Sequence, residues 1–156
     1  MTVLDLTLTR VFDAPRELVF EVWTEPEHLA RWWGPTGFTT PSCEIDLVEG
    51  GRWRTRIHNA TNGLRLRSSG VYQEIRRPER LVFTFAWEIA GSRAPDMLVT
   101  VTFADFDGRT EMTFHQTPFD SIAQQNDHID GWIQCFADLA AYLTERVAAV
   151  TREERR

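Results

Sequence analysis

Residues 122–150 read IAQQNDHIDGWIQCFADLAAYLTERVAAV, and this stretch decides the fold. Apolar side chains recur in it every three or four residues, the spacing that places them on one face of an α-helix. The stretch therefore predicts a single long C-terminal helix, whose apolar face another part of the chain must cover. The apolar stripe comprises Ile129, Ile133, Phe136, Ala140, Leu143 and Val147.

The sequence before this helix predicts antiparallel strands. Alternating apolar and polar residues, interrupted by Asn-Gly and Asp-Gly turns, are typical of β-hairpins. Residues 3–12 predict a first strand, and two short helices follow it, the second opened by a capping box at Thr24 and Glu27. The later strands are predicted at residues 42–48, 52–58, 64–76, 80–88, 97–105 and 109–116.

The order of these elements predicts the architecture. An antiparallel sheet of this size must bury one face, and the last helix is the only element long enough to cover it. We therefore expect an α+β fold in which a curved antiparallel sheet of about six to seven strands wraps around the C-terminal helix. The two short helices close one end. Residues 1–150 are expected to form one domain, and residues 151–156 a charged, frayed tail.

The charged residues exclude several functions. All 17 basic residues are arginine, so there is no lysine for a Schiff base, a pyridoxal cofactor or a phosphate-binding loop. The net charge of −6 argues against nucleic acid as a partner. Cys43 and Cys135 are far apart and are interpreted as reduced thiols of a cytoplasmic protein. Residues 1–12 do not resemble a signal peptide, and no membrane span is predicted.

A series of motifs resembles one protein family. Residues 10–35 read RVFDAPRELVFEVWTEPEHLARWWGP, and they are followed by GGRW at 50–53, GVYQEI at 70–75, PERLVFT at 78–84 and HIDGW at 128–132. Together they resemble the START-like superfamily, in the branch named after the activator of the heat-shock protein ninety ATPase. The resemblance implies the helix-grip fold, in which many members hold an apolar small molecule between sheet and helix. Other members are cyclases, dehydratases or chaperone regulators, so the fold does not imply one activity.

Aromatic residues indicate a candidate binding site. Six tryptophans and ten phenylalanines exceed what a core of this size needs, and cavities for apolar ligands are typically lined by such rings. The alternative is that the rings pack as ordinary core. The candidate lining, completed by one isoleucine and one tyrosine, is Trp53, Ile57, Tyr72, Phe83, Phe85, Trp87, Phe103, Phe114, Trp132 and Phe136. The resemblance adds Trp33 and Phe38, with Trp32, at the mouth.

His128 is the candidate polar group of this site. It lies four residues before Trp132, on the same face of the predicted helix. Its charge changes near neutral pH, so it could bond a ligand oxygen or act as an acid or base. The alternative is a structural histidine satisfied by Asp127, Asp130 or a backbone group. We count His128 as a candidate ligand-binding residue and assign it no catalytic role.

No residue pattern predicts a metal, a cofactor or a catalytic centre. Asp127, His128 and Asp130 occupy adjacent faces of a helix and cannot converge on one ion, and the sequence contains no His-x-x-x-His or Cys-x-x-Cys. The serines lack a Gly-x-Ser-x-Gly elbow. Cys135 is expected against the core or the cavity wall, where a buried thiol is inert.

Alternating arginines indicate a second candidate surface. Arg52, Arg54 and Arg56 share one face of a predicted strand, and Arg65 and Arg67 share one face of the strand that folds back on it. Such a patch could hold phosphates, an acidic protein surface or an anionic head group. The alternative is a solvated face whose charges pair with carboxylates on neighbouring strands, namely Glu44, Asp46 and Glu74.

These observations lead to three hypotheses. The first, which we predict, is a non-catalytic domain that binds a hydrophobic small molecule as a monomer or homodimer. The second is a chaperone regulator or stress-response module that recognises a protein partner through its arginines. The third is an enzyme of the cyclase or dehydratase type, for which the sequence offers no catalytic set. None of the three requires a cofactor or nucleic acid.

Overall fold

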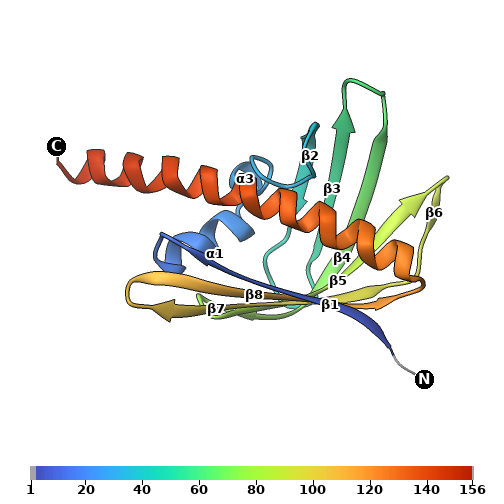
Figure 1. The fold of residues 1–156 in the computed structure, drawn as a ribbon, viewed down its shortest axis with the longest axis horizontal. Helices are drawn as coiled ribbons and strands as arrows, with labels where there is room; N and C mark the ends of the chain where they lie inside the picture. Colours follow the sequence, from blue (N-terminus) through green and yellow to red (C-terminus); the bar gives the residue numbers. More distant parts are fainter. Residues whose placement is uncertain (1–2, 156) are drawn as a thin grey trace.

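The computed structural model describes residues 3–155 as one antiparallel sheet with two short helices and one long helix (Figure 1). Residues 1–2 of the N-terminal segment discussed above, and Arg156 of the predicted tail, lie outside the described residues. The elements are β1 (Leu4–Phe12), α1 (Arg16–Thr24), α2 (Pro26–Leu29), β2 (Phe38–Ile45), β3 (Arg52–Asn59), β4 (Arg65–Arg76), β5 (Arg80–Ile89), β6 (Ser92–Arg93), β7 (Met97–Phe106), β8 (Arg109–Phe119) and α3 (Ile122–Glu154).

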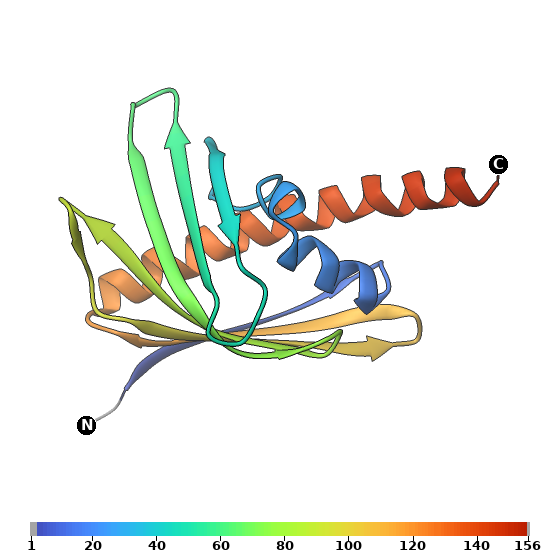
Figure 2. The same cartoon turned by 180° about the vertical axis from the view of Figure 1, so that it is seen from behind.

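The sheet curves around α3. Its strands follow the order β1-β8-β7-β5-β4-β3-β2, with β6 paired to β5, and all pairings are antiparallel. In Figures 1 and 2, β1, β7 and β8 run below the helix, whereas β3 and β4 rise past it. The predicted α+β class, with a curved antiparallel sheet around a long C-terminal helix, is therefore confirmed. Within residues 3–155 no helix is long and apolar enough to cross a membrane.

A glycine in β4 allows the sheet to bend. The register between β4 and β5 shifts between Tyr72 and Glu74, next to this position. A Cβ atom at Gly70 would clash with the carbonyl oxygen of Thr84 and with Nε1 of Trp53. Those two atoms are themselves hydrogen-bonded at 3.1 Å. Because only glycine permits this close approach, Gly70 makes room for the indole nitrogen of Trp53 and its hydrogen bond to Thr84.

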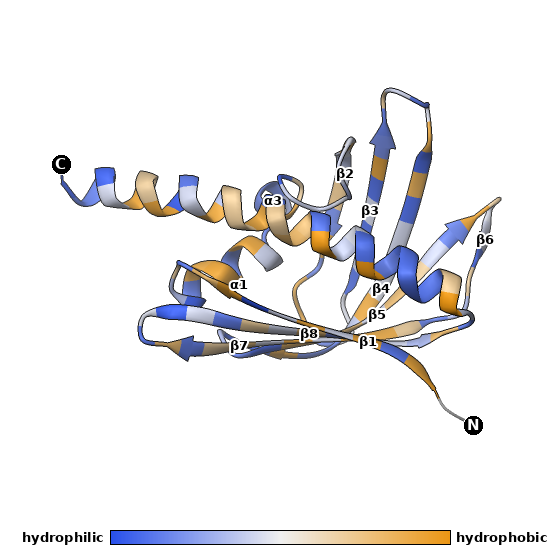
Figure 3. Cartoon of the chain, viewed as in Figure 1, coloured by the Kyte–Doolittle hydropathy of each residue, from blue (hydrophilic) through white to orange (hydrophobic). Residues whose placement is uncertain are grey.

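The helices differ from their predicted bounds and faces. α3 continues to Glu154, beyond the predicted end at 150, and polar and apolar residues alternate along its whole length (Figure 3). The buried face of α3 is rotated by about one residue from the predicted apolar stripe, so that His128 and Trp132 are buried where Ile129 and Ile133 were expected. Ile133 is 50% exposed, because the larger rings of Trp132 and Phe136 face the sheet instead. The buried residues of α3 are His128, Trp132, Cys135, Phe136, Leu139, Tyr142 and Leu143.

The connection between α1 and α2 also corrects a prediction. Thr24 is the last residue of α1, and its hydroxyl donates to the carbonyl oxygen of Phe20 at 2.9 Å instead of capping α2. The N-cap of α2 is Glu25, without a side-chain cap, and the helix ends at Leu29, so Trp32 and Trp33 lie beyond its end. After this short helix the chain turns and begins β2 at Phe38, earlier than the predicted residue 42.

One end of the interior is filled by aromatic rings around Trp23 of α1. Ring centroids of Trp32, Phe136, Phe103 and Phe114 lie 4.7 Å, 6.2 Å, 6.3 Å and 6.3 Å from that of Trp23. All five side chains are at most 2% exposed. Edge-to-face and offset ring pairs at these distances add to the stabilisation from apolar burial. α1 and α2 therefore fill the space between the sheet and the C-terminal half of α3.

Candidate functional site

An apolar cavity of about 390 Å³ lies at the other end of the interior. It is bounded by the N-terminal half of α3, by strands β3 to β5 and by the loop after α2. From α3 its wall receives Gln124, Asp127, His128, Gly131, Trp132 and Cys135. From the strands it receives Ile57, Leu66, Phe85 and Trp87, and from the loop Trp33, Gly34 and Pro35.

A helical glycine makes room for this cavity. The lining positions of α3 recur every three or four residues, so they form one stripe along the helix. Gly131 lies in the middle of that stripe, and a Cβ atom built on it meets no atom within 4 Å. Any larger residue there would project into open space. The absence of a side chain at Gly131 therefore contributes directly to the cavity volume.

A buried hydrogen-bond network holds three rings of the cavity wall. Oε1 of Gln116, on β8, accepts from Nε1 of Trp132 at 2.8 Å and lies 3.1 Å from Nδ1 of His128. Nε1 of Trp87 donates to Nε2 of His128 at 3.0 Å. An indole nitrogen can only donate, so Nε2 of His128 accepts and Nδ1 carries the proton. His128 is thus the neutral Nδ1–H tautomer, and both its nitrogens bind protein atoms.

This network bears on the two interpretations of His128. Burial lowers the pKa of His128 from 6.5 to about 4, an effect that the nearby carboxylate of Asp127 opposes. A neutral ring with both nitrogens engaged offers no free donor or acceptor to a ligand. These contacts favour the structural interpretation of His128, although its partners are Gln116 and Trp87 and not the expected Asp127, Asp130 or backbone group.

The structure separates the predicted lining residues into two groups. Those that line the cavity are Trp33, Ile57, Phe85, Trp87, His128 and Trp132. The others do not line it: Phe38, Trp53, Tyr72, Phe83, Phe103, Phe114 and Phe136 lie in or against the hydrophobic core. The residues of this second group pack as ordinary core, which is the alternative given for the aromatic residues above.

Several wall residues were not predicted, although the sequence holds signals for them. Helical spacing from His128 and Trp132 indicates Gln124 and Gly131, whereas Cys135 was already expected against the core or the cavity wall. In β8, Gln116 follows the buried Met112 and Phe114 at intervals of two, so the strand period places it on the inner face. The alternation that places Arg65 and Arg67 on the outer face also places Leu66 on the inner face. No comparable signal exists for Gly34 or Pro35, since their positions depend on how the loop after α2 meets α3.

Both cysteines are free thiols held in the protonated form. Cys43 in β2 is half-buried, and Cys135 in α3 is 4% exposed. Burial raises the pKa of Cys43 to about 11 and that of Cys135 to about 12. A thiol with a raised pKa is a poor nucleophile. Cys135 therefore contributes to the cavity as a small apolar group.

The five predicted arginines share the outer face of β3 and β4. Arg52, Arg54 and Arg56 are exposed, whereas the intervening residues of β3 are buried. The register pairs Arg56 with Arg67, which places those two side chains on one face. Arg65 lies two residues before Arg67 and is exposed like it. The five arginine side chains therefore lie on one face of the β3–β4 hairpin, as the sequence predicts.

Carboxylates lie among these arginines. NH2 of Arg54 is 3.8 Å from Oε1 of Glu88 on β5, and a polar groove of about 660 Å³ contains Glu44, Asp46 and Glu88 besides Arg52 and Arg54. The expected pairing with Glu74 is wrong. That carboxylate instead binds two other side chains, Arg76 at 2.9 Å and Arg80 at 2.8 Å, and its pKa is lowered by the hydrogen bond from Arg80. The outer face thus carries charges of both signs.

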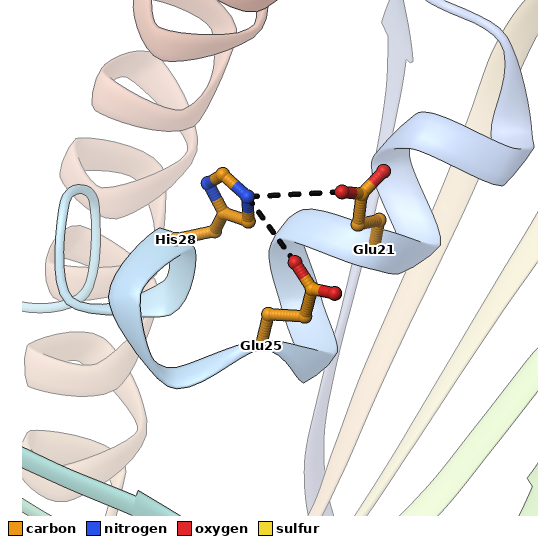
Figure 4. A group of neighbouring side chains, drawn as sticks. All are labelled: Glu21, Glu25 and His28. Carbon is orange, nitrogen blue, oxygen red and sulfur yellow. Dashed lines mark ion pairs between the residues drawn. The ribbon is translucent and has the colours of Figure 1, made fainter.

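Three side chains at the junction of α1 and α2 could hold a metal ion (Figure 4). Nε2 of His28 lies 3.7 Å from Oε1 of Glu21 and 3.2 Å from Oε2 of Glu25. Nδ1 of His28 is hydrogen-bonded to the hydroxyl of Tyr142 on α3 at 2.5 Å. The same contacts describe an ion-pair cluster that joins the short helices to α3. Glu21, Glu25 and His28 are four and three residues apart in the sequence, a spacing that could have indicated this group.

Comparisons with known proteins agree with this architecture. The family model described as activator of Hsp90 ATPase homolog 1-like protein matches residues 13–144. A solved protein from Chromobacterium violaceum is 28% identical with a TM-score of 0.80, over 89% of this chain and 96% of that chain. The AHSA1 protein from Silicibacter pomeroyi is 26% identical with a TM-score of 0.81, over 91% and 99%. No curated protein matches the chain.

Proposed function

We propose, from the premise that this chain belongs to the family of activator of Hsp90 ATPase homolog 1-like proteins, that its cavity binds an apolar small molecule without transforming it. The observation that carries the proposal is the cavity itself, about 390 Å³ in volume. Cavities for small molecules are commonly about 300–1,000 Å³ and are lined mainly by apolar and aromatic side chains. The wall of Trp33, Phe85, Trp87 and Trp132 matches that description.

The absence of a catalytic role is also part of the proposal. An acid or base must reach a reacting proton within hydrogen-bond distance and titrate near the working pH. His128 lacks both properties, because its nitrogens bind Gln116 and Trp87 and its pKa is about 4. Cys135, with a pKa of about 12, is a poor nucleophile. These two side chains therefore favour binding over catalysis.

A cavity-filling series at Gly131 tests the proposal. The uncharged naphthalene dye Prodan should bind the native protein with a blue shift of its emission and a micromolar dissociation constant. Gly131→Ala should weaken binding slightly, and Gly131→Leu and Gly131→Phe should weaken it at least tenfold, because their side chains enter the cavity. Replacing a helical glycine gains roughly 0.5–1 kcal/mol of helix propensity, so the melting temperature should not fall.

A leucine introduced on the exposed side of the same helix is the control. Ala141 lies on the exposed side of α3, outside the cavity. Ala141→Leu places the same leucine side chain outside the cavity and should leave the dissociation constant unchanged. If Gly131→Leu binds Prodan as tightly as the native protein, or if the native protein does not bind it saturably, the proposed function is wrong.

A second candidate function rests on the arginine face. Five exposed guanidinium groups on one side of β3 and β4 could recognise an acidic segment of a protein partner. A poly-glutamate peptide is a suitable probe, and its binding should weaken steeply with salt and disappear in Arg54→Glu. The carboxylates within the same groove oppose such binding. Salt-independent or absent binding of the peptide would eliminate this candidate.

A further inference from the structure

The wall of the cavity contains one carboxylate, that of Asp127. The other titratable groups of the wall are His128 and Cys135, and burial keeps both of them uncharged. No arginine lines the cavity within residues 3–155, although the chain contains 17 of them. Asp127 therefore supplies the one acidic or basic side chain that is not held neutral in the wall of this cavity.

The charge of Asp127 is not neutralised by a protein partner. Asp127 lies on α3 one turn before Gly131 and is exposed at the rim of the cavity. Among the described residues, none of the ion pairs involves Asp127. An unpaired carboxylate at the mouth of an apolar cavity attracts a cationic group and repels an anionic one.

The aromatic wall also favours a positively charged ligand group. Trp33, Phe85, Trp87 and Trp132 all contribute to the lining. The face of an aromatic ring is negative, so a cation within about 6 Å of the ring centroid is attracted to it, most strongly by tryptophan. Proteins use aromatic cages of this kind to recognise quaternary ammonium ligands.

The register of β3 and β4 keeps the arginines away from this space. Ile57 and Leu66 face each other across the two strands and line the cavity. Their neighbours Arg56 and Arg67 face each other on the outer side of the sheet. A ligand carboxylate in the cavity would therefore lose its hydration without gaining a cationic partner, which is strongly unfavourable.

We propose that the cavity selects its ligand by charge: it binds an apolar ring compound that carries an amine, whose ammonium group lies at Asp127, and it excludes carboxylates. The apolar ring lies against the tryptophans, below the rim. This inference rests on the proposed function, because it assigns the class of ligand to the same cavity.

Three naphthalene derivatives with the same ring test the inference. They are 2-naphthylmethylammonium, 2-naphthalenemethanol and 2-naphthoate, each titrated into the full chain by calorimetry. The ammonium compound should bind about fivefold more tightly than the alcohol, the attraction of unit charges about 4 Å apart in water. The carboxylate should bind at least tenfold more weakly than the alcohol. High salt should reduce the advantage of the ammonium compound and leave the affinity of the alcohol unchanged.

Two variants that change the net charge by the same amount distinguish an effect of the cavity on ligand affinity from an effect of the overall charge of the protein. Asp127→Asn should reduce the affinity for the ammonium compound to that for the alcohol. Asp130→Asn is the control, because Asp130 is an exposed residue of the same helix that does not line the cavity. It should leave all three affinities unchanged, and circular dichroism should show that both variants are folded.

The outcomes distinguish this inference from the proposed function. If the alcohol binds and charge makes no difference, or if both variants act equally, the charge selection is wrong and the binding function stands. Tighter binding of the carboxylate would also overturn the charge selection alone. If none of the three compounds binds, the proposed function fails and the inference fails with it.

Discussion

The two ends of the interior are built from the same sheet and the same helix, yet one is filled and the other is hollow. At the filled end, α1 inserts Phe20 and Trp23 between the sheet and α3, and neither side chain is more than 2% exposed. At the hollow end no such helix intervenes, and α3 contributes Gly131. Trp132 forms the partition, 4.6 Å from the ring of Phe114 and 5.2 Å from that of Trp33.

This difference shows that the cavity results from missing side-chain volume and not from a special concentration of aromatic rings. Both ends are rich in tryptophan and phenylalanine, so aromatic content alone does not distinguish a ligand site from a core. The distinguishing features are a glycine on the helix and polar groups that already bind one another. Substitutions at the two ends should therefore affect different properties, stability at one and ligand affinity at the other.

The largest effect is expected at the filled end. Phe103 of β7 is 1% exposed, with its ring 5.7 Å from that of Phe20. Phe103→Ala should lower the free energy of unfolding by about 3–5 kcal/mol, through lost burial and the void left behind. Urea denaturation measures this change, and Phe103→Leu, which retains most of the volume, is the milder control. A loss of less than about 1 kcal/mol in Phe103→Ala would mean that this end is not solidly packed.

The second prediction concerns the acceptor shared by two donors at the partition. Gln116→Leu removes the oxygen that receives Nε1–H of Trp132 and Nδ1–H of His128, both of them buried. An unsatisfied buried donor costs about 1–3 kcal/mol, so the two orphaned donors should lower the stability of the variant by at least about 2 kcal/mol. Adding Trp132→Phe removes one orphaned donor. This second substitution should therefore cost less in the Gln116→Leu background than in the native protein, and equal costs would show that the hydrogen bond contributes little.

The third prediction is a pH dependence at the hollow end. The pKa of His128 is about 4 in the folded protein and 6.5 ordinarily, because burial disfavours the charged ring. The unfolded chain takes up the proton first as the pH falls, so stability should decrease between about pH 6.5 and pH 4 and then level off. The shift corresponds to a loss on the order of 3 kcal/mol. Subtracting the profile of His128→Gln cancels the carboxylates, and a flat difference would contradict the neutral, buried histidine.

The sequence predicted the architecture far better than the contents of the cavity. Alternation along a strand indicates the face of the sheet on which a side chain lies. It placed Trp53 and Phe85 on the inner face and the arginines on the outer face, as the structure does. It does not report the position along the groove, so residues of the filled end such as Phe103 were assigned to the ligand site. Helical spacing on α3 similarly placed Ile133 inside, because period alone does not show which of two overlapping faces carries the larger rings.

The network around Gln116 was beyond sequence reasoning for a different reason. Glutamine is usually exposed, and its burial here depends on two donors that approach from α3, a separate element. The strand period places Gln116 on the inner face, but only the packing of α3 on β8 shows that the amide is satisfied. The same packing favours the structural interpretation of His128, which the sequence left open between two alternatives.

The smallest effect is expected on the outer face, where the sheet carries charge in place of aromatic rings. The guanidinium of Arg54 is 60% exposed and lies 3.8 Å from the carboxylate of Glu88. Water screens such a pair, and holding two long side chains together opposes the attraction, so exposed pairs contribute about 0–1 kcal/mol. Arg54→Ala should therefore change the free energy of unfolding by less than about 1 kcal/mol, and a double-mutant cycle with Glu88→Gln should give a coupling in the same range. Prodan affinity should not change, because Arg54 and the cavity lie on opposite faces of β3. A larger coupling, or a change in dye binding, would mean that the two faces of the sheet are not independent.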